Sequence, residues 1–260
     1  MKGCKRSNAK SGINIGEMEK NVFSLRVFPT YCKKSQGSVN NIIFNNENQV
    51  DMNILIFGAS GKTGHELVKQ ALQQGHAVTA FVRTPSKLKV QHRDLKVVQG
   101  DVTDAFSVQN AINGNDVVLS TLGAKSPFKF DQSVVDGVGN IIKAMEQNNV
   151  SRFIYMSFVG VKETHGNAGF VIKYIAPKLL STEIAGHEAR ESMIKLCKLN
   201  WTIVRPPTLT NGKHIAQFRS GEDITSKGFT VTFSRADVAD FMLRQLTDNT
   251  FLRKAPIIMY

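Results

Sequence analysis

The sequence predicts an α/β fold built on a doubly wound parallel sheet, and two patterns support this prediction. From Met52 onward, short apolar runs alternate with longer segments whose apolar residues recur at helical spacing. Strands that are apolar throughout are typical of parallel sheets, because helices cover both faces of such sheets. A glycine-rich turn also follows the first apolar run directly. We therefore expect residues 52–260 to form a single domain.

Residues 1–51 differ from the rest of the chain and are expected to form a separate, basic N-terminal extension. They carry eight basic and four acidic side chains, a net charge of +4, and five asparagines lie between Asn40 and Asn48. Asparagine favours turns over helix or strand. An organelle transit peptide is an alternative, although three glutamates argue against it. We expect a disordered or poorly ordered extension, with the working protein beginning at Met52.

The predicted elements follow one another at the period of a doubly wound sheet. Gly75 is a natural terminator of the first helix, and Ser234 with Asp237 resembles a capping box at the start of the last helix. The valine, isoleucine and methionine stripe of the helix near 132–148 indicates core packing. We expect strands at 53–57, 77–82, 96–99, 116–121, 152–157, 201–204 and 256–259, and helices at 63–74, 132–148, 181–197 and 235–247.

The glycines at 58, 61 and 64 point to a dinucleotide-binding turn between the first strand and the first helix. Gly58 allows a sharp turn, Gly61 lets the backbone approach a pyrophosphate, and Gly64 lets the helix pack close to the strand. The free N–H groups of the helix N-terminus favour phosphate. The spacing is one residue wider than the usual fingerprint, and a tight turn without ligand is the alternative. A Walker-type phosphate loop fits poorly, because its first glycine is missing.

Arg83, at the end of the second strand, predicts a preference for NADP(H) over NAD(H). Enzymes that prefer NAD usually place a carboxylate here, and a carboxylate would repel the 2′-phosphate of NADP. A guanidinium binds that phosphate bidentately, and Lys87 lies nearby in sequence. A solvated loop arginine is the alternative.

Three further strand ends complete the predicted cofactor site, because ligands of open α/β folds bind at the carboxyl edge of the sheet. Asp101 is placed to accept from the adenine amino group, and Gly123 leaves room for a ribose. Ser157 and Phe158 follow the strand at 152–157, where the reacting end of a nicotinamide is expected.

Composition narrows the class of partner and the compartment. The net charge is +12, but the chain has neither a dense Lys/Arg run nor a nucleic-acid motif, so we expect no nucleic-acid partner. The three cysteines have no metal-ligand spacing and an odd count, which indicates a reducing, cytoplasmic setting and no metal site. No apolar run is long enough to span a bilayer, and no secretory signal is evident, so no membrane partner is expected.

With these motifs located, residues 52–260 resemble an atypical short-chain dehydrogenase/reductase of the NAD(P)H-binding, NmrA-like group that contains biliverdin reductase B, also a flavin reductase. The resemblance rests on five stretches, namely Ile56–Gly64, Phe81–Arg83, Gly100–Val102, Trp201–Pro206 and Asp237–Thr247. It implies a Rossmann fold that binds NADP(H). The implied cofactor contacts are Gly58, Ser60, Gly61, Lys62, Thr63, Gly64, Arg83, Asp101, Val102, Leu122, Gly123, Ser157, Phe158 and Pro206.

The resemblance also implies hydride transfer from NADPH to a flavin, quinone or small carbonyl. In typical members a Tyr-x-x-x-Lys pair with an upstream Ser protonates the substrate, and Tyr174, Lys178 and Ser157 have this order here. Pro177 interrupts the helix that should align the pair, so a packing tyrosine is the alternative. Reduction of a flavin or quinone needs no protein acid, because the product takes its proton from solvent.

Several further expectations remain. The segments Ser126–Phe130, Phe158–Phe170 and Thr208–Phe218 are expected to line the acceptor pocket, and their phenylalanines favour a flat aromatic acceptor. His65 and His76 are expected at the surface, His187 carries no predicted role, and Cys197 is read as a helix-core thiol. An NmrA-like redox sensor without turnover is the main alternative function, and a sugar-nucleotide epimerase is a weaker one. The oligomeric state, monomer or homodimer, stays open.

Overall fold

The structure, a computed structural model, describes residues 51–124, 126 and 128–260. The predicted N-terminal extension therefore lies outside the described residues, apart from Asp51. The described residues belong to a single compact unit. No helix among them is long and apolar enough to cross a membrane.

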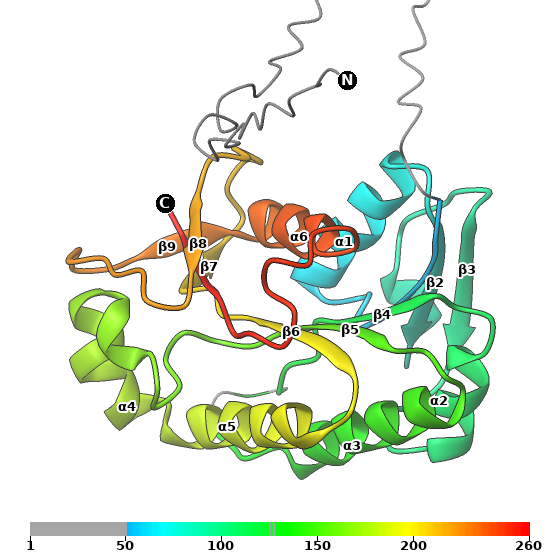
Figure 1. Ribbon diagram of the computed structural model, residues 1–260, viewed down its shortest axis with the longest axis horizontal. Coiled ribbons are helices and arrows are strands. Elements are labelled where there is room, and N and C mark those ends of the chain that lie inside the picture. The colour runs from blue at the N-terminus through cyan, green and yellow to red at the C-terminus, as the bar shows by residue number, and fades with distance from the viewer. Residues whose placement is uncertain (1–50, 125, 127) are drawn as a thin grey trace, which may run out of the picture. The chain divides into compact units, whose positions relative to one another are not determined.

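A six-stranded parallel sheet forms the centre of the unit (Figure 1), as predicted. Its strands lie in the order β3-β2-β1-β4-β5-β6, so the direction of winding reverses between β1 and β4. All five strand pairs are parallel. The strands are β1 (Asn53–Phe57), β2 (Ala77–Val82), β3 (Leu95–Gln99), β4 (Val117–Ser120), β5 (Arg152–Met156) and β6 (Asn200–Val204).

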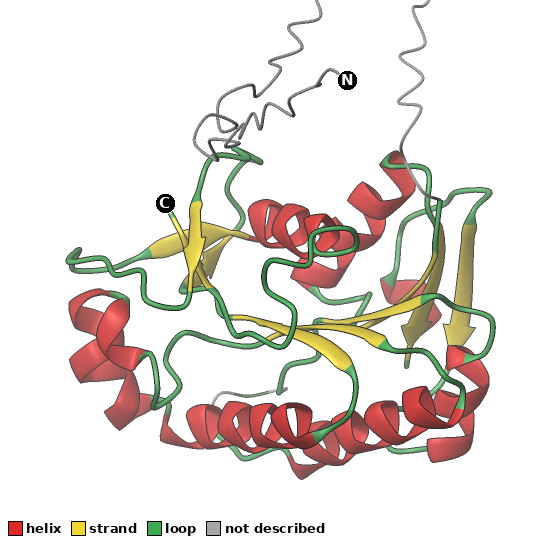
Figure 2. Cartoon of the chain, in the orientation of Figure 1, coloured by secondary structure: helices red, strands yellow, loops and turns green. Residues whose placement is uncertain are grey.

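Helices cover both faces of this sheet, as Figures 1 and 2 show. On one face lie α1 (Lys62–Gln73) and α6 (Arg235–Arg244). On the other lie α2 (Ala105–Ile112), α3 (Gln132–Gln147) and α5 (Ser181–Leu196). Each layer encloses its own core, because alternate strand residues point to opposite faces. Ile54 and Ile56 join the α1/α6 core, whereas Leu55 and Phe57 join the other.

Four short strands lie outside the main sheet. They are β7 (Thr208–Thr210), β8 (Arg219–Gly221), β9 (Thr232–Ser234) and β10 (Ile257–Met259). β10, which was predicted, pairs antiparallel with β8, while β7 pairs parallel with β9. The segment leading into β10 also bonds to β6, through Ile203 N–H to Lys254 O and Arg205 N–H to Pro256 O. It thereby covers the outer edge of β6. The sequence patterns did not predict α2, β7, β8 or β9.

The connection between β5 and α5 contains a π-helix at Val171–Ile175, followed by α4 (Ala176–Leu179). Short 3₁₀ turns lie at Pro85–Lys87 and His165–Asn167. Ala176 N–H bonds to Val171 O, the five-residue spacing of a π-helix. Pro177 has no N–H to offer the Lys173 carbonyl at the α-helical spacing, which favours this wider turn.

Candidate active site

Gly58 and Gly64 bring β1, β4 and the start of α1 into backbone contact. Gly58 has φ +77°, and a Cβ there would lie 2.9 Å from Thr121 backbone atoms at the end of β4. A Cβ on Gly64 would lie 2.1 Å from the Gly58 carbonyl oxygen. Neither position accepts a side chain, so the first turn of α1 sits directly against the carboxyl end of β1. Gly61 is the extended N-cap of that helix, without a side-chain cap. The turn has the form that holds a pyrophosphate.

Arg83 lies one residue beyond β2, on the same edge of the sheet. Its side chain is exposed, and within the described part of the chain no hydrogen bond or ion pair holds its guanidinium. Lys87, also exposed, ends the short turn at Pro85–Lys87. A surface guanidinium without a protein partner is available to a phosphate. The predicted 2′-phosphate contact therefore has a suitable donor at its expected place.

The residues predicted to contact adenine and ribose follow the ends of β3 and β4. Asp101 Oδ1 accepts hydrogen bonds from the N–H and the hydroxyl of Thr103, which fix the orientation of its carboxylate. Val102 is buried against Gly137 of α3. Beyond β4, Leu122 is half-buried, and a Cβ on Gly123 would meet no atom of the described residues within 4 Å. Packing does not explain Gly123, whereas room for a ligand would.

A cavity of about 370 Å³ adjoins the glycine turn. Its lining includes three residues of the turn, Ser60, Gly61 and Lys62, and also Arg235, the first residue of α6. The lining thus includes two residues with cationic side chains, Lys62 and Arg235, and one acidic residue, Glu66. Thr63, the remaining predicted contact in this turn, is buried.

Ser157 follows β5 and is buried at 3% exposure. Its hydroxyl donates to Glu191 Oε1 at 2.6 Å, and its Oγ also lies 3.2 Å from Nδ1 of His187. Both partners come from α5. The Ser157 hydroxyl therefore lies between a carboxylate, to which it donates, and an imidazole nitrogen. Phe158 is half-buried, with its ring 6.0 Å from His187, and Pro206 is buried beyond β6.

A buried chain of charged groups extends from Ser157 to the end of β6. Glu191 accepts from Nε and Nη2 of Arg205, and Nη2 also donates to Glu163 Oε2 at 2.7 Å. The Arg205 and Glu191 side chains are only 3% and 4% exposed. Burial opposes the charge of Arg205, yet its two carboxylate partners raise its pKa. Hydrogen bonds from Lys195 and Arg205 lower the pKa of Glu163.

The imidazole of His187 is bonded on both sides. Nε2 lies 3.1 Å from Glu183 Oε1, and Nδ1 faces Ser157. Burial lowers the pKa of His187, although the contact with Glu183 opposes that shift. Tyr155, on the same face of β5, is fully buried, and burial raises its pKa to about 12. Among these side chains the imidazole of His187 is the one whose ordinary pKa lies near neutral pH.

The sequence analysis did not predict this cluster, and it gave no role to His187. A signal was present, because Glu183, His187, Arg190, Glu191 and Ile194 recur at helical spacing and mark one face of α5. That face packs on the sheet although it is mostly polar. Charged side chains are buried in proteins only when they have partners. Arg205, the partner of Glu191, appeared in the sequence analysis only within the stretch Trp201–Pro206, without a role of its own.

Tyr174 and Lys178 lie on the π-helix and on α4, and both are exposed. The Tyr174 ring packs 4.9 Å from that of Phe170. Within the described residues, no hydrogen bond or ion pair joins Tyr174 to Lys178 or to Ser157. The predicted catalytic roles of these residues stay predictions.

One sequence expectation about a minor residue was wrong. His76 is buried, and its Nδ1 accepts from the Met52 N–H, because the chain entering β1 covers it. Cys197 packs against the core, as expected of a core thiol, but it is half-buried and forms the C-cap of α5.

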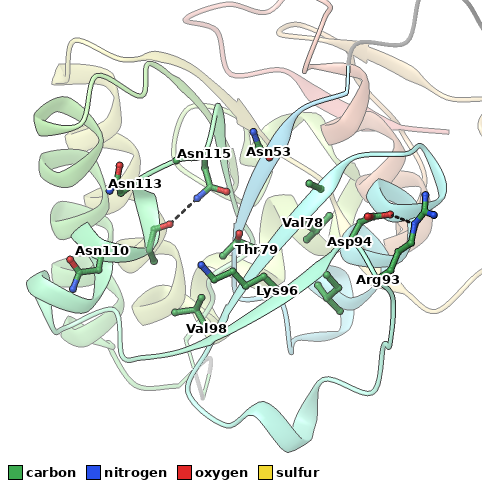
Figure 3. A pocket seen from close by; sticks show the side chains of 14 residues that line it. Asn53, Val78, Thr79, Arg93, Asp94, Lys96, Val98, Asn110, Asn113 and Asn115 are labelled. Carbon is green, nitrogen blue, oxygen red and sulfur yellow. Dashed lines mark hydrogen bonds and ion pairs between the residues drawn. The ribbon is translucent and has the colours of Figure 1, made fainter.

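A second cavity, of about 720 Å³, lies at the opposite, amino edge of β1, β2 and β3 (Figure 3). Asparagines dominate its lining, but the Asn53 amide bonds Asp116 and the Asn115 amide bonds Ala111 O. Because ligands of open α/β sheets bind at the carboxyl edge, we assign the cofactor to the glycine-turn edge instead.

His214, Asp237 and Asp240 bring potential metal-ligand atoms within 4.8 Å of one another. Asp237 Oδ1 already accepts two backbone N–H groups, and Asp240 forms an ion pair with Arg244. Asp237 is therefore hydrogen-bonded within the protein, and Arg244 balances the charge of Asp240, so we assign no cation there.

Comparisons with known proteins agree with this fold. An uncharacterised chloroplastic protein of Arabidopsis thaliana is 29% identical over 72% of this chain and 68% of its own length. Several longer curated relatives match over less than a third of their length. A short-chain dehydrogenase/reductase of Veillonella parvula, solved with NADP, superposes with a TM-score of 0.65 at 20% identity, over 81% of this chain and 95% of its own. ChuY, an anaerobillin reductase of Escherichia coli O157:H7, gives 0.64 at 21% identity, over 80% and 96%.

The likeness to these two solved structures concerns the fold, which is a Rossmann fold, as the strand order already indicated. A model of the family described as NAD(P)H-binding matches residues 58–249, which begin at the first glycine of the turn and end beyond α6. The chain therefore belongs to the NAD(P)H-binding family.

Proposed function

We propose that the protein is an NADPH-dependent oxidoreductase that transfers hydride to a flavin, a quinone or a small carbonyl compound. The observation that carries the proposal is the backbone packing of Gly58 and Gly64 at the point where the winding of the sheet reverses. The turn that would bind the phosphates lies there, with the free guanidinium of Arg83 one strand away and the buried Ser157 two strands away.

The residues present fit the cofactor. The first turn of α1 would hold the pyrophosphate, Arg83 the 2′-phosphate, and the open space at Gly123 a ribose. When bound, the nicotinamide supplies the hydride. The preference for NADPH rests on Arg83, since one charge-assisted hydrogen bond is worth about 1.5–3 kcal/mol, or roughly ten- to a hundredfold in affinity. The NADP bound in the Veillonella protein supports the same cofactor here.

On the protein side, Ser157 would lie beside the reacting end of the nicotinamide. Glu191 and His187 fix the position of its hydroxyl, and Arg205 in turn holds Glu191. The arrangement offers one positioned hydroxyl backed by ionisable groups, which suits orientation of an acceptor and exchange of a proton. The similarity of the fold to ChuY, which is named an anaerobillin reductase, supports a reductase activity for this protein.

The test is oxidation of NADPH by the full chain, followed through the absorbance of the reduced nicotinamide, with flavin, quinone and carbonyl acceptors. NADPH and NADH binding is titrated in parallel. Turnover with any of these acceptors supports the reductase. Tight NADPH binding without turnover on any of them would favour the alternative, a redox sensor that keeps every cofactor contact and reports through a partner protein.

Where the protein works in the cell is a separate prediction. The cytoplasmic setting expected from the cysteines is tested by imaging the full chain, residues 1–260, fused at its C-terminus to a fluorescent protein. Delivery to an organelle would instead support a transit peptide in residues 1–51.

A further inference from the structure

Three aromatic side chains form a continuous exposed surface, the aromatic face, made of Phe170, Tyr174 and Phe229. They are 48%, 51% and 69% exposed. The Phe170 and Phe229 rings stack at 5.5 Å with planes 13° apart, and Tyr174 lies 4.9 Å from Phe170. Large apolar side chains scattered singly on a surface need no explanation, whereas a contiguous exposed group of rings is a candidate binding site.

The aromatic face is held in place by backbone bonds between two distant segments. Phe170 N–H donates to Gly228 O, and Val171 N–H donates to Phe229 O, each at 3.1 Å. Gly169 has φ +77°, and a Cβ on it would lie 2.2 Å from Gly228 O, so the segments meet only because residue 169 lacks a side chain. The rings are therefore presented by a fixed scaffold, which lowers the entropy cost of binding.

The scaffold joins the aromatic face to the candidate active site. Beneath the rings is a small buried core that contains Val159, Ile172 and Val231, with Phe158 packed against it. Val159 follows Ser157 by two residues, and its N–H bonds Pro206 O at the end of β6. A molecule on the aromatic face would thus lie on the segment that continues directly from the proposed hydride-transfer position.

The charged side chains within the segments that build the face are all positive. The segments that build it, residues 164–180 and 224–231, contain Lys173, Lys178 and Lys227 and not a single Asp or Glu. The Lys173 ammonium lies 5.1 Å from the centre of the Tyr174 ring. A surface of this kind favours a flat ring system that also carries negative charge, because stacking and Coulomb attraction then act together.

We propose that the aromatic face is the docking surface for the acceptor, and that the acceptor is a planar aromatic molecule bearing an anionic group. This inference rests on the proposed function and narrows its three acceptor classes to one. Small aliphatic carbonyls have no π-face to stack, and neutral quinones would gain nothing from the lysines.

Two probes with the same ring and different charge test the proposal on the full chain. Flavin mononucleotide carries a phosphate and riboflavin does not, and stacking on protein aromatics quenches the fluorescence of both. We expect the wild-type protein to bind flavin mononucleotide several-fold more tightly than riboflavin. The double variant Phe170→Ser/Phe229→Ser should weaken both by about tenfold or more, the order expected for lost ring stacking.

Lys173→Gln should remove most of the preference for flavin mononucleotide while leaving riboflavin nearly unchanged. Phe106→Ser is the matched control, because Phe106 is 72% exposed on α2 and contacts none of these rings. It should leave both titrations unchanged. Because every substituted side chain is at least partly exposed, circular dichroism should show all variants folded.

Unchanged flavin binding in the double variant would overturn the proposal, as would an equal loss in Phe106→Ser. Loss in the double variant of oligonucleotide or anionic-vesicle binding, with flavin binding intact, would overturn it in favour of a macromolecular partner. The proposed function fails separately. If flavin binding depends on the aromatic face but no flavin is turned over, this inference holds and the proposed reductase activity is refuted. If flavin is turned over and the double variant has an unchanged KM, the reductase activity holds and this inference is refuted.

Discussion

Glu191→Gln is the substitution that tests the buried chain of charges most directly. Glu191 accepts from Ser157 at 2.6 Å and from Arg205 Nε at 3.0 Å, with Arg205 Nη2 on its second oxygen. A glutamine amide keeps one acceptor oxygen but turns an N–H₂ group toward the guanidinium, so Arg205 loses its buried counter-charge. Removing one partner of a buried ion pair costs about 3–5 kcal/mol. We expect the lower end, because Glu163 still contacts Arg205.

For a domain of this size, 1 kcal/mol shifts the melting temperature by roughly 2–4 °C, so a loss at the lower end, about 3 kcal/mol, should lower the melting temperature of Glu191→Gln by roughly 6–12 °C. Differential scanning calorimetry measures this shift. The matched control is Glu188→Gln on the same helix, which weakens only one exposed hydrogen bond, from the Lys162 N–H, and should cost about 1 kcal/mol or less.

Two outcomes would refute the reasoning. The first is a shift in Glu191→Gln no larger than that in Glu188→Gln. The second concerns the double variant Glu191→Leu/Arg205→Met, which removes both charges together. A buried ion pair replaced by apolar side chains of similar size is often neutral. The double variant should therefore recover most of the lost stability, and an additive loss would mean that the two residues do not act as a pair.

Three further predictions concern the cofactor site and the response to pH. Arg83→Ala should weaken NADPH binding by roughly ten- to a hundredfold and NADH binding little. The control Arg93→Ala, at an exposed residue of the amino edge, should leave the binding of both cofactors unchanged. Equal losses of affinity for both cofactors in a calorimetric titration of Arg83→Ala would exclude contact between Arg83 and the 2′-phosphate. Gly64→Ala should displace the start of α1 and abolish measurable NADPH binding, while Gly139→Ala, whose Cβ would meet only Met193 Sδ at 3.9 Å, should bind normally. Because burial holds the folded pKa of His187 below its ordinary value of 6.5, folding favours the neutral imidazole. Stability is then fully present above about pH 6.5 and declines as the pH falls toward the folded pKa. His187→Gln should flatten this part of the unfolding profile, and an unchanged slope would assign it to other groups.

Much of the fold was predictable because its determinants are local. The apolar runs of β1, β2 and β5 and the helical stripes of α1 and α3 read directly as buried elements. The cap of α6 formed as expected, with the Ser234 hydroxyl accepting from the Asp237 N–H. Its reciprocal half did not, since the Asp237 carboxylate instead accepts from the hydroxyls of Ser234 and Tyr260.

The elements that escaped prediction depend on partners distant in sequence. The helix α2 has eight residues, too short for a periodic pattern to stand out. Each of β7, β8 and β9 has three residues, and such strands gain stability only from the strand they pair with.

The sequence by itself determined the Rossmann architecture, the glycine turn and the position of Arg83, because each follows from spacing along one stretch of chain. Only the tertiary structure decided which ionisable side chains meet. Ser157, Glu191 and Arg205 come from the end of β5, from α5 and from the end of β6, and their charges are tolerable in the interior only as a mutually bonded group. The aromatic face likewise exists only where Gly169 and Gly228 bring two segments into backbone contact, a pairing that the spacing along the chain does not encode.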